Sequence, residues 1–87
     1  MWFVYILRCA DESFYVGETG DVAKRLASHN KGCASTHTAA RRPVKLAYVE
    51  EHVNRAAALE RERQLKSWSR AKKEALIAGD WASLKQA

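Results

Sequence analysis

The chain opens with an apolar segment, WFVYIL at positions 2–7, that contains no polar alternation. Aromatic and β-branched side chains predominate in this segment, and such side chains favour extended backbone. A short apolar segment without alternation is typical of a strand that is buried on both faces. We therefore expect a sheet whose first strand lies in the interior of the fold.

A second strand is expected directly after the first. Residues 11–13 (Asp-Glu-Ser) supply turn chemistry, and the β-prone residues 14–16 stop at Gly17, which together predict a hairpin. Because side chains alternate across a strand, Tyr5 and Tyr15 share a face if the loop is odd-numbered or contains a bulge. An even-numbered loop would separate them. The default role of both tyrosines is that of core aromatic residues whose hydroxyls bond to the backbone.

Helix-capping residues predict where three helices begin, at Asp21, Asn54 and Ser69. The first helix should run to about residue 30 and end at Gly32, the second to about residue 67, and the third to just before Gly79. The inward side chains of the first helix are expected to be Val22, Ala23, Leu26 and Ala27.

The stretch between the first two helices divides into a loop and a strand. Residues 31–42 show no periodicity and form a long segment for a compact domain, and such loops are often functional. After Pro43, the alternation of Val44, Leu46 and Tyr48 predicts a third strand.

The length of 87 residues predicts a single domain over residues 1–87, with a core from 1 to about 78 and a tail from 79 to 87. Trp81 and Leu84 of this tail are expected to fold back onto the helices. No apolar run approaches the roughly 20 residues of a membrane span, and no segment resembles a signal peptide, so we expect a soluble cytoplasmic protein without membrane contact. Cys9 and Cys33 form no paired motif, which argues against a disulfide framework and a zinc cage.

The net charge of +5 is unevenly distributed along the chain. Residues 24–45 hold six basic and no acidic side chains, and residues 55–73 hold seven basic and two acidic ones. If these two blocks converge, they form a positive surface that attracts phosphates. Two solvated helix faces explain the same charges equally well.

Glu62 lies at the centre of an apolar helical stripe. The residues within roughly 60° of it around the helix are Ala58, Leu59, Leu65 and Lys66. An inward carboxylate is costly unless it is paired or binds a cation, whereas Glu60 points the other way. Two explanations fit, a metal ligand or an ion pair with Arg25 or Lys66, and spacing alone favours the ion pair.

Arg25 and His29 stand one helical turn apart and therefore share a face of the first helix. The planar guanidinium of arginine suits a phosphoryl group, although a surface salt bridge with Asp21 is the usual alternative. His29 is equally well explained as a helix-end histidine that interacts with the helix dipole.

These residues together resemble the GIY-YIG endonuclease superfamily, whose name records two tyrosine-containing tripeptides about ten residues apart. Val4-Tyr5-Ile6 and Tyr15-Val16-Gly17 stand at that separation, and the resemblance continues through Arg25, His29 and Glu62 to about residue 78. The length is similar to that of the small stand-alone bacterial members. The ordered set of residues is far more specific than either tripeptide alone.

The resemblance implies metal-dependent hydrolysis of a phosphodiester. The catalytic residues would be Tyr5, Tyr15, Arg25, His29 and Glu62. Glu62 would hold one Mg²⁺ or Mn²⁺, Arg25 would stabilise the transition state, and a tyrosine assisted by His29 would take the proton of the attacking water. Which tyrosine is the base is left open. The expected nucleic-acid contacts are Gly17, Thr19, Lys24, Arg41, Arg42, Lys66 and Arg70.

Three features depart from the family pattern. Phe3 replaces the first glycine of the family name, at a position without a chemical role. Glu18 is acidic where many relatives are basic or neutral, which would weaken phosphate binding. Many proficient relatives carry an asparagine beyond the glutamate, and this chain has none after Asn54.

We expect an α+β fold in which a three-stranded antiparallel sheet is flanked by helices in the order ββαβαα. The expected function is that of a divalent-metal-dependent endonuclease of low sequence specificity, acting on DNA rather than RNA. The main alternative is a non-catalytic or weakly active nucleic-acid-binding module with the same fold. A structural protein whose charge serves only solubility leaves the ordered site residues unexplained.

Overall fold

A computed structural model of the chain describes residues 1–80. Three antiparallel strands form a sheet in the order β2-β1-β3, and β1 is therefore the central strand. Along the chain the elements are β1 (Trp2–Arg8), β2 (Phe14–Thr19), α1 (Val22–Asn30), α2 (Thr36–Ala39), β3 (Lys45–His52), α3 (Arg55–Lys66) and α4 (Arg70–Ala78). The predicted α+β sheet with flanking helices is confirmed.

The register of the hairpin places the two tyrosines on one face of the sheet. Leu7 pairs with Tyr15 and Tyr5 pairs with Gly17, and directly opposed side chains project to the same side. The loop between Arg8 and Phe14 has an odd number of residues, which satisfies the predicted condition. A bulge shifts the register between β1 and β3 at Ile6 and Leu7.

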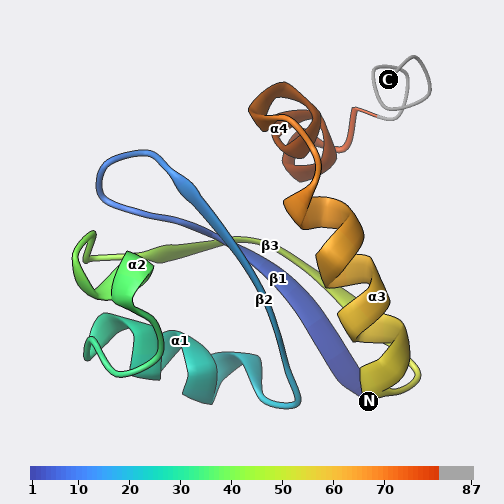
Figure 1. The fold of residues 1–87 in the computed structure, drawn as a ribbon, viewed down its shortest axis with the longest axis horizontal. Coiled ribbons are helices and arrows are strands. Elements are labelled where there is room, and N and C mark those ends of the chain that lie inside the picture. Colours follow the sequence, from blue (N-terminus) through green and yellow to red (C-terminus); the bar gives the residue numbers. More distant parts are fainter. Residues whose placement is uncertain (81–87) are drawn as a thin grey trace.

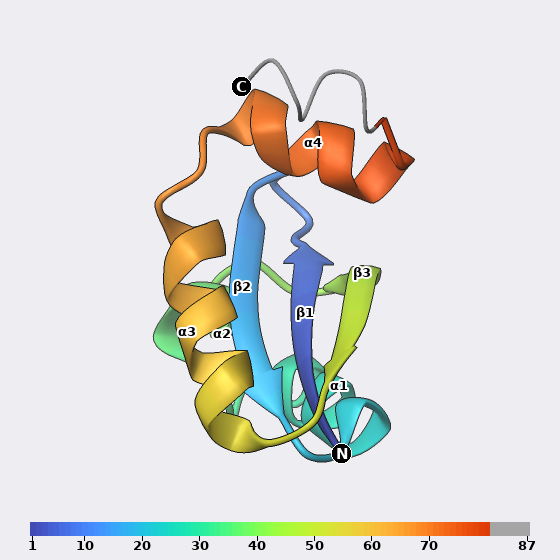
Figure 2. The ribbon, with the colours of Figure 1, turned by 90° about the vertical axis from the view of Figure 1, so that its right-hand side faces the viewer.

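The helices cover the sheet from both sides, with α1 and α2 on one side and α3 on the other (Figure 1). Figure 2 shows that α4 lies across the end of the sheet, beside the loop between β1 and β2. Each side has its own apolar cluster. Val4, Ile6 and Val16 pack against the buried Ala58, Leu65 and Leu76 of α3 and α4. Tyr5, Leu7, Cys9 and Val44 form the second cluster, against which Tyr15 and Leu26 pack. The double coverage explains why β1 lacks polar alternation.

The three predicted helix starts are confirmed. The side chains of Asp21, Asn54 and Ser69 each accept a hydrogen bond from the backbone N–H three residues on. Gly79 ends α4 in the left-handed conformation, with φ of 73°. None of the helices within residues 1–80 is long and apolar enough to cross a membrane.

Several local predictions were wrong. The segment 31–42 contains the short helix α2, and β2 continues past Gly17 to Thr19. Ala23 and Ala27 are exposed, because the inward side of α1 is centred on Leu26 and the buried His29. The predicted packing of Trp81 and Leu84 lies outside the described residues.

Candidate active site

Tyr5 occupies the centre of the site and is almost completely buried, with 2 % of its surface exposed. Its ring lies over Gly17 on the neighbouring strand, where an added Cβ would overlap the phenol. Only a residue without a side chain leaves room for the ring at this position. Gly17, which was predicted to contact nucleic acid, thus serves to seat Tyr5.

A chain of hydrogen bonds runs from Tyr5 through the interior of the α1–α2 layer. The Tyr5 hydroxyl lies 2.9 Å from His29 Nε2, and His29 Nδ1 lies 2.8 Å from Thr38 Oγ1. The Thr38 hydroxyl donates in turn to the backbone carbonyl of Ser35 at 3.3 Å. Both His29 and Thr38 are completely buried. The predicted default of a backbone bond for the tyrosine hydroxyl therefore does not hold for Tyr5.

One arrangement of protons satisfies every group in this chain. In it the Thr38 hydroxyl donates its proton to Ser35, whose carbonyl lies at 3.3 Å and whose Oγ lies at 3.1 Å, and Thr38 Oγ1 accepts from His29 Nδ1–H. His29 Nε2 then carries no proton and accepts the Tyr5 hydroxyl proton. We assign this tautomer to His29, with its basic nitrogen on the tyrosine.

Burial and nearby charges shift the pKa values of Tyr5 and His29 in the directions that favour the neutral form of each side chain. Burial and the proximity of Tyr15 raise the pKa of Tyr5 to about 12, against the opposing effect of the Arg25 guanidinium. Burial, followed by the positive charge of Arg25, lowers the pKa of His29. His29 is consequently a neutral acceptor at pH 7 rather than a cation that interacts with the helix dipole.

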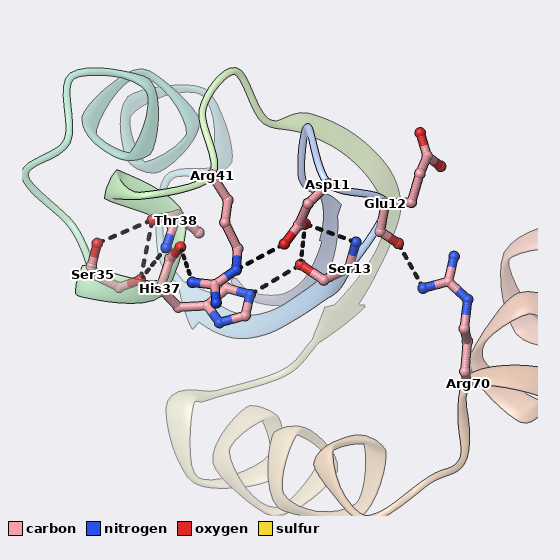
Figure 3. Close-up of polar contacts among 8 residues, drawn as sticks. All are labelled: Asp11, Glu12, Ser13, Ser35, His37, Thr38, Arg41 and Arg70. Atoms are coloured by element: carbon pink, nitrogen blue, oxygen red, sulfur yellow. Dashed lines mark hydrogen bonds and ion pairs between the residues drawn. The ribbon is translucent and has the colours of Figure 1, made fainter.

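Tyr15 is more exposed than Tyr5 and contacts two histidine rings. Its ring centroid lies 5.0 Å from that of His29 in an edge-on arrangement and 5.9 Å from that of His37 in a stacked one. His37 Nε2 lies 3.2 Å from Ser13 Oγ, and Ser13 Oγ donates to Asp11 at 2.6 Å. His37 therefore donates through Nε2–H to Ser13 Oγ (Figure 3). This bond orients the His37 ring that stacks on Tyr15.

Arg25 is exposed on α1 within electrostatic reach of Tyr5 and His29, whose pKa values it affects. The salt bridge with Asp21 that offered an alternative explanation is not among the ion pairs of residues 1–80, in which Asp21 caps α1 by accepting from the backbone N–H of Lys24. Arg25 lines a shallow depression together with Thr19, Asp21, Lys24 and Ser28. Lys24 is exposed there, whereas Thr19 is buried and bonds to the backbone of Asp21.

Glu62 lies on α3, which covers the opposite side of the sheet from α1. The side chain is 18 % exposed, and its carboxylate lies 3.3 Å from the amino group of the more exposed Lys66. Its charge nevertheless contributes to raising the pKa of Tyr5.

Arg41 and Arg70 hold the β1–β2 loop from two sides (Figure 3). Arg41 Nε donates to Asp11 at 2.9 Å, and Arg70 Nη1 donates to the Glu12 carbonyl at 2.6 Å. Arg70 also lies over the Phe14 ring, 4.4 Å from its centroid. Both arginines, which were predicted as phosphate contacts, are thus engaged within the protein. Arg42 is exposed and donates to the Ala39 carbonyl.

Three residues that bond to or stack on the site were not predicted as site residues from the sequence, namely Thr38, His37 and Ser13. The sequence contains one signal for α2, because serine favours the N-cap position of a helix. In the structure Ser35 is this N-cap, and its side chain accepts from the backbone N–H of Thr38. Glu18, predicted to weaken phosphate binding, instead pairs with Trp2 and with Arg55 at 3.5 Å. Its side chain is 15 % exposed, so its charge is largely compensated.

Comparison with known proteins matches residues 1–75 to the GIY-YIG catalytic domain family. The chain belongs to the GIY-YIG family. Membership identifies a nuclease-type domain whose substrate class is nucleic acid. The predicted resemblance is confirmed.

The GIY-YIG relatives include proteins of similar length. A UPF0213 protein of Natronomonas pharaonis is 45 % identical over 78 residues, which cover 90 % of this chain and 92 % of the relative. One from Clostridium perfringens is 45 % identical over 78 residues, covering 90 % and 84 %. The solution NMR structure of a UPF0213 protein from Bacillus halodurans has a TM-score of 0.57 and 37 % identity, and the match covers 90 % and 84 %.

GIY-YIG nucleases are generally metal-dependent, and the carboxylate of Glu62 is the type of ligand that a hard divalent cation prefers. Within residues 1–80 no group of three or more His, Cys, Asp or Glu side chains could hold an ion by itself. Mg²⁺ does not require such a cage, because it retains several waters and binds through one or two carboxylates plus substrate phosphates. Glu62 supplies one largely buried carboxylate whose lysine partner is exposed and free to move aside.

Proposed function

We propose that this GIY-YIG protein is a divalent-metal-dependent endonuclease that hydrolyses phosphodiester bonds of DNA with low sequence specificity. The observation that carries the proposal is the buried bond between the Tyr5 hydroxyl and His29 Nε2, which joins a candidate base to a neutral proton acceptor. Arg25 and Glu62 lie within electrostatic reach of the same hydroxyl. The five proposed catalytic residues are Tyr5, Tyr15, Arg25, His29 and Glu62.

Proton removal from the attacking water is assigned to Tyr5 and His29 together. With a pKa of about 12, Tyr5 is too rarely ionised at pH 7 to act as a free phenolate. The hydroxyl oxygen instead accepts the proton of the water while its own proton passes to His29 Nε2 across 2.9 Å. His29 becomes an imidazolium in a buried position that disfavours charge, so it readily returns the proton.

Tyr15 and Arg25 are assigned to positioning and charge stabilisation. Tyr15 is the more exposed tyrosine, and its hydroxyl is suited to orient the water or a phosphate oxygen. The exposed guanidinium of Arg25 neutralises the charge that develops on the phosphoryl oxygens. A divalent cation held by Glu62 would polarise a non-bridging oxygen and stabilise the leaving oxygen.

The proposal is tested by incubating the purified protein with linear, nicked, single-stranded and branched DNA and with RNA, each with Mg²⁺, with Mn²⁺ or with EDTA. We expect cleavage of at least one DNA substrate that requires the added cation and shows little dependence on sequence. Salt-dependent binding without cleavage of any substrate would contradict catalysis and support the nucleic-acid-binding module. Cleavage of RNA alone would contradict the choice of DNA.

A further inference from the structure

A shallow depression of about 220 Å³ lies at the free edge of β2. Its lining residues are Phe14, Tyr15, Val16, His37, Lys66 and Lys73. Successive residues of β2 face opposite sides of the sheet, so a depression lined by three of them in a row opens around the edge of the strand. The lining contains two lysines and no acidic side chain.

Lys73 is a half-buried cation without a carboxylate partner. Within residues 1–80 no carboxylate lies within ion-pair distance of its amino group, and the adjacent Glu74 pairs with Arg70 at 3.0 Å instead. Lys66, the second cation, is paired with Glu62, and among the residues that the structure describes it has no second carboxylate partner. If Glu62 binds a divalent cation, the charge of Lys66 also becomes available to an anion in the depression.

The side chains that form the wall of the depression contact one another without any ligand present. The stacked rings of Tyr15 and His37 form one side, and the chain from His37 through Ser13 to Asp11 fixes their orientation. Arg41 and Arg70 brace the loop behind this wall (Figure 3). A preorganised wall lowers the entropic cost of ordering side chains when a ligand binds.

The second depression along β2 contains Lys24 and Arg25 beside Thr19. Val16 and Thr19 are three residues apart on the strand, which corresponds to roughly 10 Å at 3.3 Å per residue. Cationic side chains therefore line a depression near each end of β2, Lys66 and Lys73 at one end and Lys24 and Arg25 at the other.

We propose that the depression formed by His37, Lys66 and Lys73 binds a backbone phosphate that neighbours the scissile one, in a nucleic-acid strand that runs along the free edge of β2. The inference rests on the proposed nuclease function and adds a substrate subsite to it. Its ligand is an exposed phosphodiester. Recognition through lysine charges and a ring wall carries no base specificity.

The test measures the affinity of a short fluorescein-labelled DNA in EDTA, by fluorescence anisotropy over a series of salt concentrations. Lys73→Ala is expected to weaken binding severalfold at low salt and to reduce the slope of log K against log salt by about 0.9, the contribution of one phosphate contact. Lys73→Arg should restore both quantities. Circular dichroism of each variant verifies that the fold is retained.

Lys45→Ala is the matched control, since it removes one exposed lysine from β3 at the opposite edge of the sheet. It should leave the affinity and the slope close to those of the wild type. Equal effects of Lys73→Ala and Lys45→Ala would overturn the subsite while leaving the nuclease proposal intact. Absence of salt-dependent binding by the wild type would overturn both.

Discussion

Tyr5 is the residue whose surroundings depart most from those of an ordinary core aromatic residue. Its hydroxyl bonds to a buried histidine, whereas Tyr48, whose pKa burial also raises to about 12, bonds to Glu50 at 2.8 Å. Tyr48 contributes to the apolar cluster on the α3 side. Tyr48 is therefore a suitable control for Tyr5, because both hydroxyls have a pKa of about 12 and only that of Tyr5 bonds to His29.

Tyr5→Phe should lower the cleavage rate by about 10²- to 10⁴-fold, because it removes the proton relay while retaining the ring. The free energy of unfolding should fall by about 1 kcal/mol for the lost hydrogen bond. Single-turnover cleavage and urea denaturation measure the two effects. Tyr48→Phe should change stability by a similar amount without a comparable loss of rate, and equal rates for the two variants would contradict the assignment of Tyr5.

Thr38→Val removes the acceptor of His29 Nδ1–H while nearly preserving the shape of the side chain. The unpaired buried donor should cost about 1–3 kcal/mol of unfolding free energy, and cleavage should slow because the imidazole can adopt the wrong tautomer. Thr38→Ser keeps the hydroxyl and should largely restore the rate. Nitrogen-15 NMR of His29 reports the tautomer directly, and an unchanged Nδ1–H tautomer in Thr38→Val would contradict the role of Thr38.

Among the secondary-structure elements, the short helix α2 connects the segment 31–42 to the candidate site. It supplies Thr38 to His29 and the stacked His37 to Tyr15, and Arg41 follows it immediately. Its four residues are too few to show a helical periodicity in the sequence. Longer elements were predictable because their caps Asp21 and Asn54 and the apolar segment of β1 are local signals.

Arg41→Ala should act on the hairpin more than on DNA binding. The side chains of Arg41 and Asp11 are 37 % and 49 % exposed, so the loss of this pair, together with the bond to the His37 carbonyl, should lower the free energy of unfolding only slightly. Urea denaturation should detect this change. The salt dependence of DNA binding should stay near that of the wild type, and a slope reduced as in Lys73→Ala would instead identify Arg41 as a phosphate contact.

At the scale of the whole molecule, the stability should depend on pH through His29. Its pKa is lower in the folded protein than the ordinary value of 6.5, so the unfolded chain binds more protons near that pH. Stability is therefore fully present above about pH 6.5 and is lost as the pH falls. Urea denaturation between about pH 5 and 7.5 measures this slope, and the carboxyls of Asp11 and Glu50, whose pKa values are lowered, titrate below that range.

His29→Gln should remove the His29 contribution to this slope, since glutamine has no proton to gain. The other ionisable groups remain in the variant and serve as the internal reference. If the wild type and His29→Gln have equal slopes, or if stability increases as the pH falls, the neutral buried state of His29 is contradicted.

The residues of the site were easier to predict than their contacts. Tyr5, Tyr15 and Gly17 were accessible to sequence analysis because hairpin register depends on local loop length. Arg41 bonds to Asp11, which is 30 positions away in the sequence, and Arg70 bonds to Glu12, which is 58 positions away. No local sequence pattern predicts such pairs. The prediction from the basic blocks of the sequence therefore overestimated the number of arginines that are free to bind phosphate.

In the proposed mechanism, Glu62 acts together with Tyr5 and Arg25 in metal-dependent cleavage. Glu62→Gln keeps the size and hydrogen-bonding capacity of the side chain and removes the charge that would hold a cation. Glu60→Gln makes the same chemical change at an exposed position of the same helix and is the control.

The role of Glu62 is tested by the metal-dependent single-turnover cleavage rates of Glu62→Gln and Glu60→Gln on one DNA substrate. DNA affinity is measured in parallel. Glu62→Gln should lower cleavage to the rate seen in EDTA while DNA binding persists or strengthens, because the site becomes less negative. Glu60→Gln should cleave at the wild-type rate. Wild-type cleavage by Glu62→Gln would show that the active centre lies elsewhere on the protein.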